Sequence, residues 1–172
     1  MKIGILLSVF VPLLFGVVSA WADNGAESAR AGVPQLERFM GTWYEIARFD
    51  HRFERGLWQV QLHCRMLSDG LVDVESRGVH YRTGAQRRVK GRVRVAGPGR
   101  LRVSFRWFFY RDCVVLELDE AGRWALIGGR KADCLWILSR SPELSGRTLN
   151  RILRMARRRG YATRKLLYVG SE

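Results

Sequence analysis

The sequence has few cysteines, few prolines and no cluster of metal-binding side chains. Its 172 residues include three cysteines, four prolines and three histidines. The cysteines lie far apart, and no CxxC pair or His/Cys group has the spacing of a zinc site. Because their number is odd, at least one thiol stays unpaired in a monomer, so the cysteines do not form a closed disulfide framework. We expect neither a metal site nor a cofactor.

Long apolar runs are also scarce, and the one that is present lies at the N-terminus. Lys2 is followed by an almost wholly apolar stretch, residues 3–18, and then by the small residues of segment 19–22. This layout is typical of a secretory signal that is cleaved after Ala22. A retained membrane anchor is the alternative, since about 17 apolar residues can just span a bilayer. Pro12 interrupts the run, which favours cleavage.

No cysteine precedes Cys64, although a bacterial lipoprotein signal needs one at its cleavage point. The expectation is therefore export without an acyl anchor, into the periplasm of a bacterium with two membranes, with association with the outer membrane left open. The chain then divides into a signal peptide (1–22), a polar flexible leader (23–32) and one domain (33–172).

Acidic side chains are outnumbered, with 16 Asp and Glu against 30 Lys and Arg, a formal net charge of +14. Such an excess favours anionic partners, which are nucleic acids or the phosphate-rich faces of membranes. The cations are scattered over strand exteriors and the chain carries an export signal, so no nucleic-acid partner is expected. An anionic membrane surface remains as a candidate partner.

From residue 33 onward, short stretches alternate apolar and polar side chains and are separated by turn residues. In segment 88–95 every second residue is cationic and the others are small or apolar, and segment 101–105 repeats the pattern after a Gly-Pro-Gly turn. Alternation of this kind gives each strand one apolar and one charged face.

Three later segments (113–118, 124–128 and 135–138) are apolar on both faces, so their outer side needs a cover. A helix is predicted to supply it, with Ser145 as N-cap and Gly160 as C-terminal stop. The apolar residues at helical spacing are Leu149, Ile152, Leu153 and Ala156.

The order of these elements predicts an all-β fold, an eight-stranded antiparallel up-and-down β-barrel with one C-terminal helix packed outside and a short final strand over 165–169. Closure removes exposed sheet edges, and about eight strands enclose an interior that holds one small ligand.

Three ordered segments carry a family resemblance: GTWYEIARFDHRFERG at 41–56, YRDCVVLELD at 110–119 and LWILSRSP at 135–142. They resemble the lipocalins, and among these most nearly the bacterial outer-membrane (apolipoprotein D-like) type. The resemblance covers essentially all of the chain after the leader. It implies a carrier and not an enzyme, which binds, stores or transports a lipid-like amphiphile in the cell envelope for membrane maintenance.

The resemblance also assigns structural roles. In that family the tryptophan of the G-x-W motif plugs the closed end of the barrel, and the arginine after the eighth strand packs over it. These residues match Trp43 and Arg140, and Gly41 permits the tight backbone turn before them.

The inward phase of the alternating strands predicts the pocket wall, with one further residue at its rim: Trp58, Val60, Leu62, Val74, Val93, Val103, Phe105 and, at the rim, Tyr110. Four loops, at 49–57, 80–86, 106–112 and 129–133, are expected to form the open mouth, and they are rich in aromatic and cationic residues. An apolar interior with a basic, aromatic rim suits an amphiphile with an anionic head, such as a fatty acid or a lysophospholipid.

Two rival functions stay open, as does the choice between monomer and homodimer. Cys64 has an inward phase, at a place similar to that of the reactive cysteine of a lipocalin-type prostaglandin synthase, but no neighbour in sequence would lower the pKa of its thiol. The other rival is a carrier of haem or a siderophore. His51, His63 and His80 form no coordinating set, although His51 and His80 belong to mouth loops.

Cys113 and Cys134 are expected near the open end, on strands separated by one intervening strand. Their Cα atoms should then lie about 10 Å apart, since neighbouring strands are about 4.8 Å apart. A disulfide requires less than about 7 Å, so free thiols are predicted.

Overall fold

The computed structural model describes residues 36–170 apart from residues 98 and 107–108, and it describes no side chain within 106–110. The predicted signal peptide and flexible leader lie outside the described residues.

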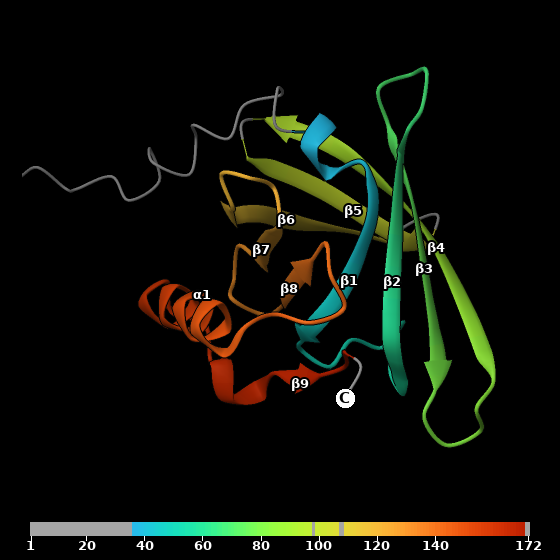
Figure 1. Ribbon diagram of the computed structural model, residues 1–172. Helices are drawn as coiled ribbons and strands as arrows, with labels where there is room; N and C mark the ends of the chain where they lie inside the picture. Colours follow the sequence, from blue (N-terminus) through green and yellow to red (C-terminus); the bar gives the residue numbers. More distant parts are fainter. Residues whose placement is uncertain (1–35, 98, 107–108, 171–172) are drawn as a thin grey trace, which may run out of the picture.

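A short 3-10 turn, η3 (Glu37–Phe39), leads into the barrel strands. These are β1 (Gly41–Arg48), β2 (Leu57–Met66), β3 (Val72–His80), β4 (Gln86–Gly97), β5 (Arg100–Arg106), β6 (Phe109–Leu118), β7 (Trp124–Gly129) and β8 (Leu135–Ser139). They are followed by helix α1 (Gly146–Arg158), a 3-10 turn η4 (Thr163–Lys165) and strand β9 (Leu167–Tyr168) (Figure 1).

The sheet closes because β1 pairs on both of its edges. Its first half pairs with β2, and its second half pairs with β8 from Tyr44 to Arg48. Every pair of neighbours in the barrel is antiparallel. The predicted eight-stranded up-and-down barrel is therefore confirmed.

The final strand lies outside the barrel and is shorter than predicted. The N–H of Lys165 donates to the carbonyl of Ala162, which folds segment 163–165 into a turn instead of a strand. Only Leu167 and Tyr168 pair with β1.

Helix α1 covers the strands that are apolar on both faces, as predicted. Ile152, Met155 and Ala156 pack in an outer core that includes Leu126, Ile137 and four other barrel residues. The Ser145 hydroxyl accepts from the N–H of Thr148, which confirms the N-cap. Gly160 follows the last turn with a φ of +85°, a conformation that favours glycine. No helix in the part of the chain that the structure describes is long and apolar enough to span a membrane.

The end of the barrel below η3 is closed by a stacked pair. Trp43 is fully buried and donates its indole N–H to the Phe39 carbonyl at 2.9 Å. Cζ of Arg140 lies 3.7 Å from the centre of a Trp43 ring. The guanidinium also donates to three backbone carbonyls, those of Arg38, Met40 and Thr42. The predicted stacking is present, and it ties η3 and β1 to the end of β8.

Trp43→Ala should lower the free energy of unfolding by about 3–5 kcal/mol through the cavity that it leaves. Arg140→Ala should cost less, because its side chain keeps part of its contact with solvent. Urea denaturation of both variants measures the two losses. Arg154→Ala, on the exposed face of α1, is the control and should change stability by less than about 0.5 kcal/mol. A Trp43→Ala variant as stable as this control would contradict the closing role.

Candidate functional site

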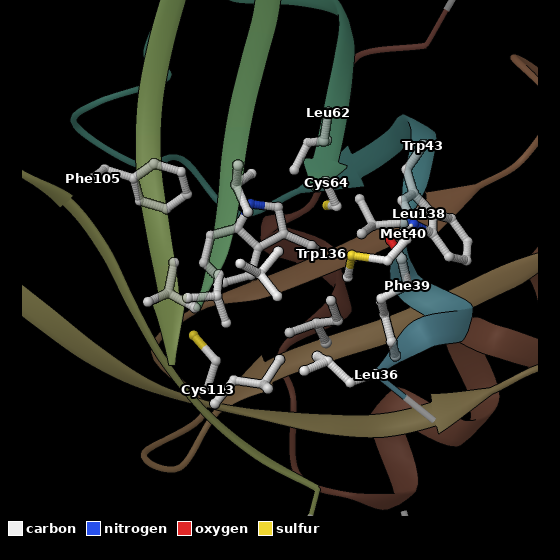
Figure 2. A pocket seen from close by; sticks show the side chains of 16 residues that line it. Leu36, Phe39, Met40, Trp43, Leu62, Cys64, Phe105, Cys113, Trp136 and Leu138 are labelled. Carbon is white, nitrogen blue, oxygen red and sulfur yellow. Dashed lines mark hydrogen bonds between the residues drawn. The ribbon is translucent and has the colours of Figure 1, made fainter. Parts of the chain in front are cut away.

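A cavity of about 80 Å³ lies inside the barrel, next to the closed end (Figure 2). Its walls are apolar side chains, and the two indole N–H groups among them donate to the Phe39 carbonyl and to Glu54. The thiols of Cys64 and Cys113 and the thioether of Met40 remain as weakly polar groups. The cavity therefore offers dispersion contacts and almost no hydrogen-bonding partner.

Five of the predicted wall residues line this cavity: Leu62, Val74, Val93, Val103 and Phe105. Val60 is buried among the inner core residues but does not reach the cavity. The side chain of Tyr110 lies outside the described residues.

Trp43 was predicted at the closed end of the barrel, but the other residues of the cavity floor were not predicted. Leu36, Phe39 and Met40 come from η3 and its flanks, and Trp43 and Trp136 complete the surface. The apolar residues just before the G-x-W motif are the sequence signal for a place in the cavity floor. They precede the first strand, so the alternation that marks inward-facing strand residues does not apply to them.

The prediction that Trp58 lines the pocket is wrong. Its side chain is 39% exposed and borders a groove on the outside of the barrel with Ile46 and Tyr168. The cause is a β-bulge in β2, where the pairing with β3 shifts register and Gln59 has a φ of +49°. The bulge moves the inward phase from Trp58 to Leu57, whose side chain is buried.

The loop between β1 and β2 folds into the mouth and covers the cavity from that side. The ring centroids of Phe53 and Phe105 lie 4.1 Å apart, and those of His51 and Trp136 lie 4.3 Å apart. Phe105 and Trp136 are cavity walls, so the loop closes the cavity with an aromatic stack.

A buried charged network anchors this loop. Arg48 donates to the Glu45 carboxylate at 2.9 Å and to the carbonyls of Glu54 and Leu57 at 2.6 and 2.8 Å. The Glu54 carboxylate accepts from Ser76 at 3.0 Å and from the Trp136 indole at 3.4 Å. All three charged side chains are at most 1% exposed.

Two carboxyl groups face one guanidinium in this network, and burial raises both of their pKa values. The pKa of Glu45 is raised well above its usual range, first by burial and then by the neighbouring Glu54. Burial also raises the pKa of Glu54, against the opposing effect of Arg48. A proton shared by the two carboxyl groups would leave the buried network uncharged overall.

The thiols of Cys113 and Cys134 meet across Gly129. Cys113 pairs with Gly129 in the sheet, and the N–H of Gly129 donates to the carbonyl of Cys134. All three cysteines of the chain are free, in line with the prediction. Burial raises the pKa of the Cys64 thiol to about 11, whereas a hydrogen bond from Cys113 lowers the pKa of Cys134.

A second hollow, of about 500 Å³, opens on the surface beside these thiols. Cys134 forms part of its wall, and the exposed side chains around it include Arg111, Arg130 and Lys131. Asp112 and Asp133 also line the groove and neutralise part of this charge, and the Asp133 carboxylate lies 3.3 Å from a guanidinium nitrogen of Arg111. Cys113 thus lines the apolar cavity, Cys134 lines the basic groove, and their thiols are in contact.

A family model described as a lipocalin-like domain matches residues 35–171. The chain is similar to outer membrane lipoprotein Blc of Vibrio cholerae serotype O1, with 39% identity over 78% of this chain and 81% of that protein. Blc of Escherichia coli K12 is 41% identical over 77% of each chain. Among solved structures, lobster apocrustacyanin A1 superposes with a TM-score of 0.72 at 16% identity, covering 87% of each chain, and this likeness concerns the fold alone.

The stability of the protein should depend on pH through His51. Burial, reinforced by Arg111 and Arg48, lowers the pKa of this imidazole from 6.5 to about 4. Between these values the unfolded chain binds a proton that the folded protein does not, so stability falls as the pH falls. At about 1.4 kcal/mol per pKa unit, the loss should be about 2–3 kcal/mol.

The variant His51→Phe keeps an aromatic ring between Phe53 and Trp136 but does not titrate. Urea denaturation of both proteins at about pH 7 and about pH 4 should show a larger acid-induced loss in the wild type. Equal losses in the two proteins would show that His51 is not held neutral by the fold.

Proposed function

This chain belongs to the lipocalin family, and from that premise we propose that it binds, stores or transports a lipid-like amphiphile, a fatty acid or a lysophospholipid, in the cell envelope. The observation that carries the proposal is the cavity with almost wholly apolar walls, which lies next to a surface groove whose cations outnumber its carboxylates. The apolar tail would enter the first and the anionic head would remain in the second.

The cavity accounts for the tail. Each buried methylene group contributes about 0.8 kcal/mol of gross transfer free energy, and ordering of the chain removes part of the sum. At about 80 Å³ the closed cavity holds only part of an acyl chain. Binding of a full chain therefore requires the loop between β1 and β2 to withdraw Phe53 from its stack on Phe105.

The basic groove accounts for the head. Arg130 and Lys131 are exposed and make no ion pair in the described part of the chain, so their charges are available to a carboxylate or a phosphate, whereas Arg111 is already paired with Asp133. Cys113 lines the cavity, Cys134 lines the groove, and the two buried thiols are in contact, so a ligand that occupies both spaces has to move this pair apart.

A carrier role fits the chemistry of the cavity better than catalysis does. The Cys64 thiol faces the cavity, but its pKa of about 11 keeps it protonated near neutral pH. A catalytic cysteine has to be a thiolate to act as a nucleophile. The predicted secretory signal and the relatives named as outer membrane lipoproteins both support a location in the envelope. We propose that location without assigning an acyl anchor.

Haem or a siderophore is the alternative cargo, and His51 is the observation in favour of haem. Its imidazole is buried, neutral and close to the cavity, and its Nε2 has no hydrogen-bond partner. A haem iron would bind the lone pair of Nε2, which lies in the plane of the imidazole ring and not on the faces that Phe53 and Trp136 cover. A visible absorption spectrum of protein purified from its host distinguishes haem from a fatty acid, because haem absorbs visible light and a fatty acid does not.

Val103→Phe, which fills part of the cavity, should weaken binding of a fluorescent fatty acid at least about tenfold, or about 1.4 kcal/mol. Val114→Phe is the matched control, because this side chain lies on the neighbouring strand β6 and is absent from the cavity wall. Fluorescence titration of both variants measures the affinities, and urea denaturation verifies that both are folded. Equal affinities would place the tail elsewhere and contradict the proposal.

A further inference from the structure

Exposed aromatic side chains gather at the open end of the barrel. The large apolar residues exposed in the described part of the chain are Trp58, Met66, Tyr81, Leu167 and Tyr168. Met66 ends β2 at the closed end, whereas Trp58 begins β2, Tyr81 lies in the turn between β3 and β4, and the last two form β9. Figure 1 shows that β9 and the β3–β4 turn lie at the same end of the molecule.

The outward position of Trp58 is maintained by a strained backbone. The φ of +49° at Gln59 is uncommon for a residue other than glycine and costs about 1–3 kcal/mol. The Gln59 N–H donates to the Val169 carbonyl at 2.6 Å, which joins the bulge to the segment after β9. Trp58 and Tyr168 line one surface groove.

Cations accompany these aromatic residues. Arg82 lies 5.4 Å from the Tyr81 ring, and Arg164 and Lys165 belong to η4, which is separated from β9 by Leu166 alone. In the described part of the chain, none of these three cations makes an ion pair, and neither do Arg52 and Arg130 in the mouth loops. We call Trp58, Tyr81, Leu167 and Tyr168, with these five cations, the mouth patch.

Interleaved aromatic and cationic side chains match the headgroup region of an anionic bilayer. Trp and Tyr rings favour the headgroup level of a bilayer, and each Lys or Arg near an anionic leaflet contributes about 1 kcal/mol of attraction. A second protein surface would need carboxylates opposite so many unpaired cations. Among the described residues around the patch, Glu143 borders the same groove as Trp58 and Tyr168, and Asp50 is already paired with Arg55. The cations outnumber these carboxylates, so a second copy of this chain is a poor electrostatic match.

We propose that the mouth patch docks the open end of the barrel on a bilayer that contains anionic phospholipid. Docking in this orientation places the loop between β1 and β2 against the lipid headgroups. A ligand can then pass between the bilayer and the cavity without crossing water. The inference concerns the outer surface and holds whichever hydrophobic cargo the cavity takes.

Flotation with vesicles of about one part phosphatidylglycerol to about three parts phosphatidylcholine tests the proposal. The full chain after signal removal should float with these vesicles and not with vesicles of phosphatidylcholine alone. The double variant Trp58→Ser/Tyr168→Ser should bind at least about tenfold more weakly. Met66→Ser is the matched control, because it removes a similarly exposed apolar side chain at the closed end and should bind like the wild type.

A second pair of variants separates a local contact from general attraction by the net charge. Arg164→Glu/Lys165→Glu and Arg147→Glu/Arg151→Glu change the charge equally, but the second pair lies on helix α1. The affinity of the Arg164→Glu/Lys165→Glu variant for vesicles should be at least about tenfold lower than that of the Arg147→Glu/Arg151→Glu variant. Equal losses, or unchanged binding of the Trp58/Tyr168 double variant, would overturn the proposal.

Two further measurements make the outcome unambiguous. If sedimentation showed a wild-type dimer that the Trp58/Tyr168 double variant dissociates while vesicle binding stays unchanged, the patch would be a contact between copies and the proposal would fall. Titration of the double variant with the fluorescent fatty acid should give wild-type affinity, because neither side chain lines the cavity. Loss of docking and loss of cargo binding are thereby measured separately.

Discussion

Strand β1 has to pair with β2 along its first half and with β8 along its second half, because only this double pairing closes the sheet. The change of partner occurs near a β-bulge between Glu45 and Ala47. Past the bulge Ala47 joins the outer core under α1, while Arg48 points inward to the Glu45 carboxylate. Closure of the barrel therefore also places charge in its interior, and the Trp43 and Arg140 stack holds the start of the same strand.

The interior consequently has two chemical zones. Toward the closed end it is an apolar cavity, whereas toward the mouth it is a network of buried charges joined to the loop that covers that cavity. The two zones meet at Trp136, whose ring is a cavity wall and whose N–H donates to Glu54. Displacement of the loop would break hydrogen bonds of Arg48 and Glu54 and separate two aromatic stacks. Such a cost limits spontaneous opening and favours a ligand that replaces the lost apolar contacts.

Local patterns in the sequence predicted the parts of the fold that depend on local rules. Alternation predicted which faces of β3, β4 and β5 point inward, and helical spacing with Ser145 and Gly160 predicted α1. Trp58 was misplaced because the alternation around it is unbroken, and Gln59 carries none of the glycine or asparagine signals of a left-handed backbone. The bulge forms through a tertiary contact with Val169, and no local pattern reports that contact. Local patterns also do not report that η3 and the loop around Glu54 contribute to the interior, because both pack against residues that are distant in the sequence.

Native mass spectrometry of protein purified from its host tests whether the apolar cavity takes the tail of an amphiphile. We expect a bound species that organic solvent extracts as a fatty acid or a lysophospholipid and that is absent when a bulkier side chain fills the cavity. A protein that carries no such species, or that carries the same species whether or not the cavity is filled, would show that the cavity is not the binding site.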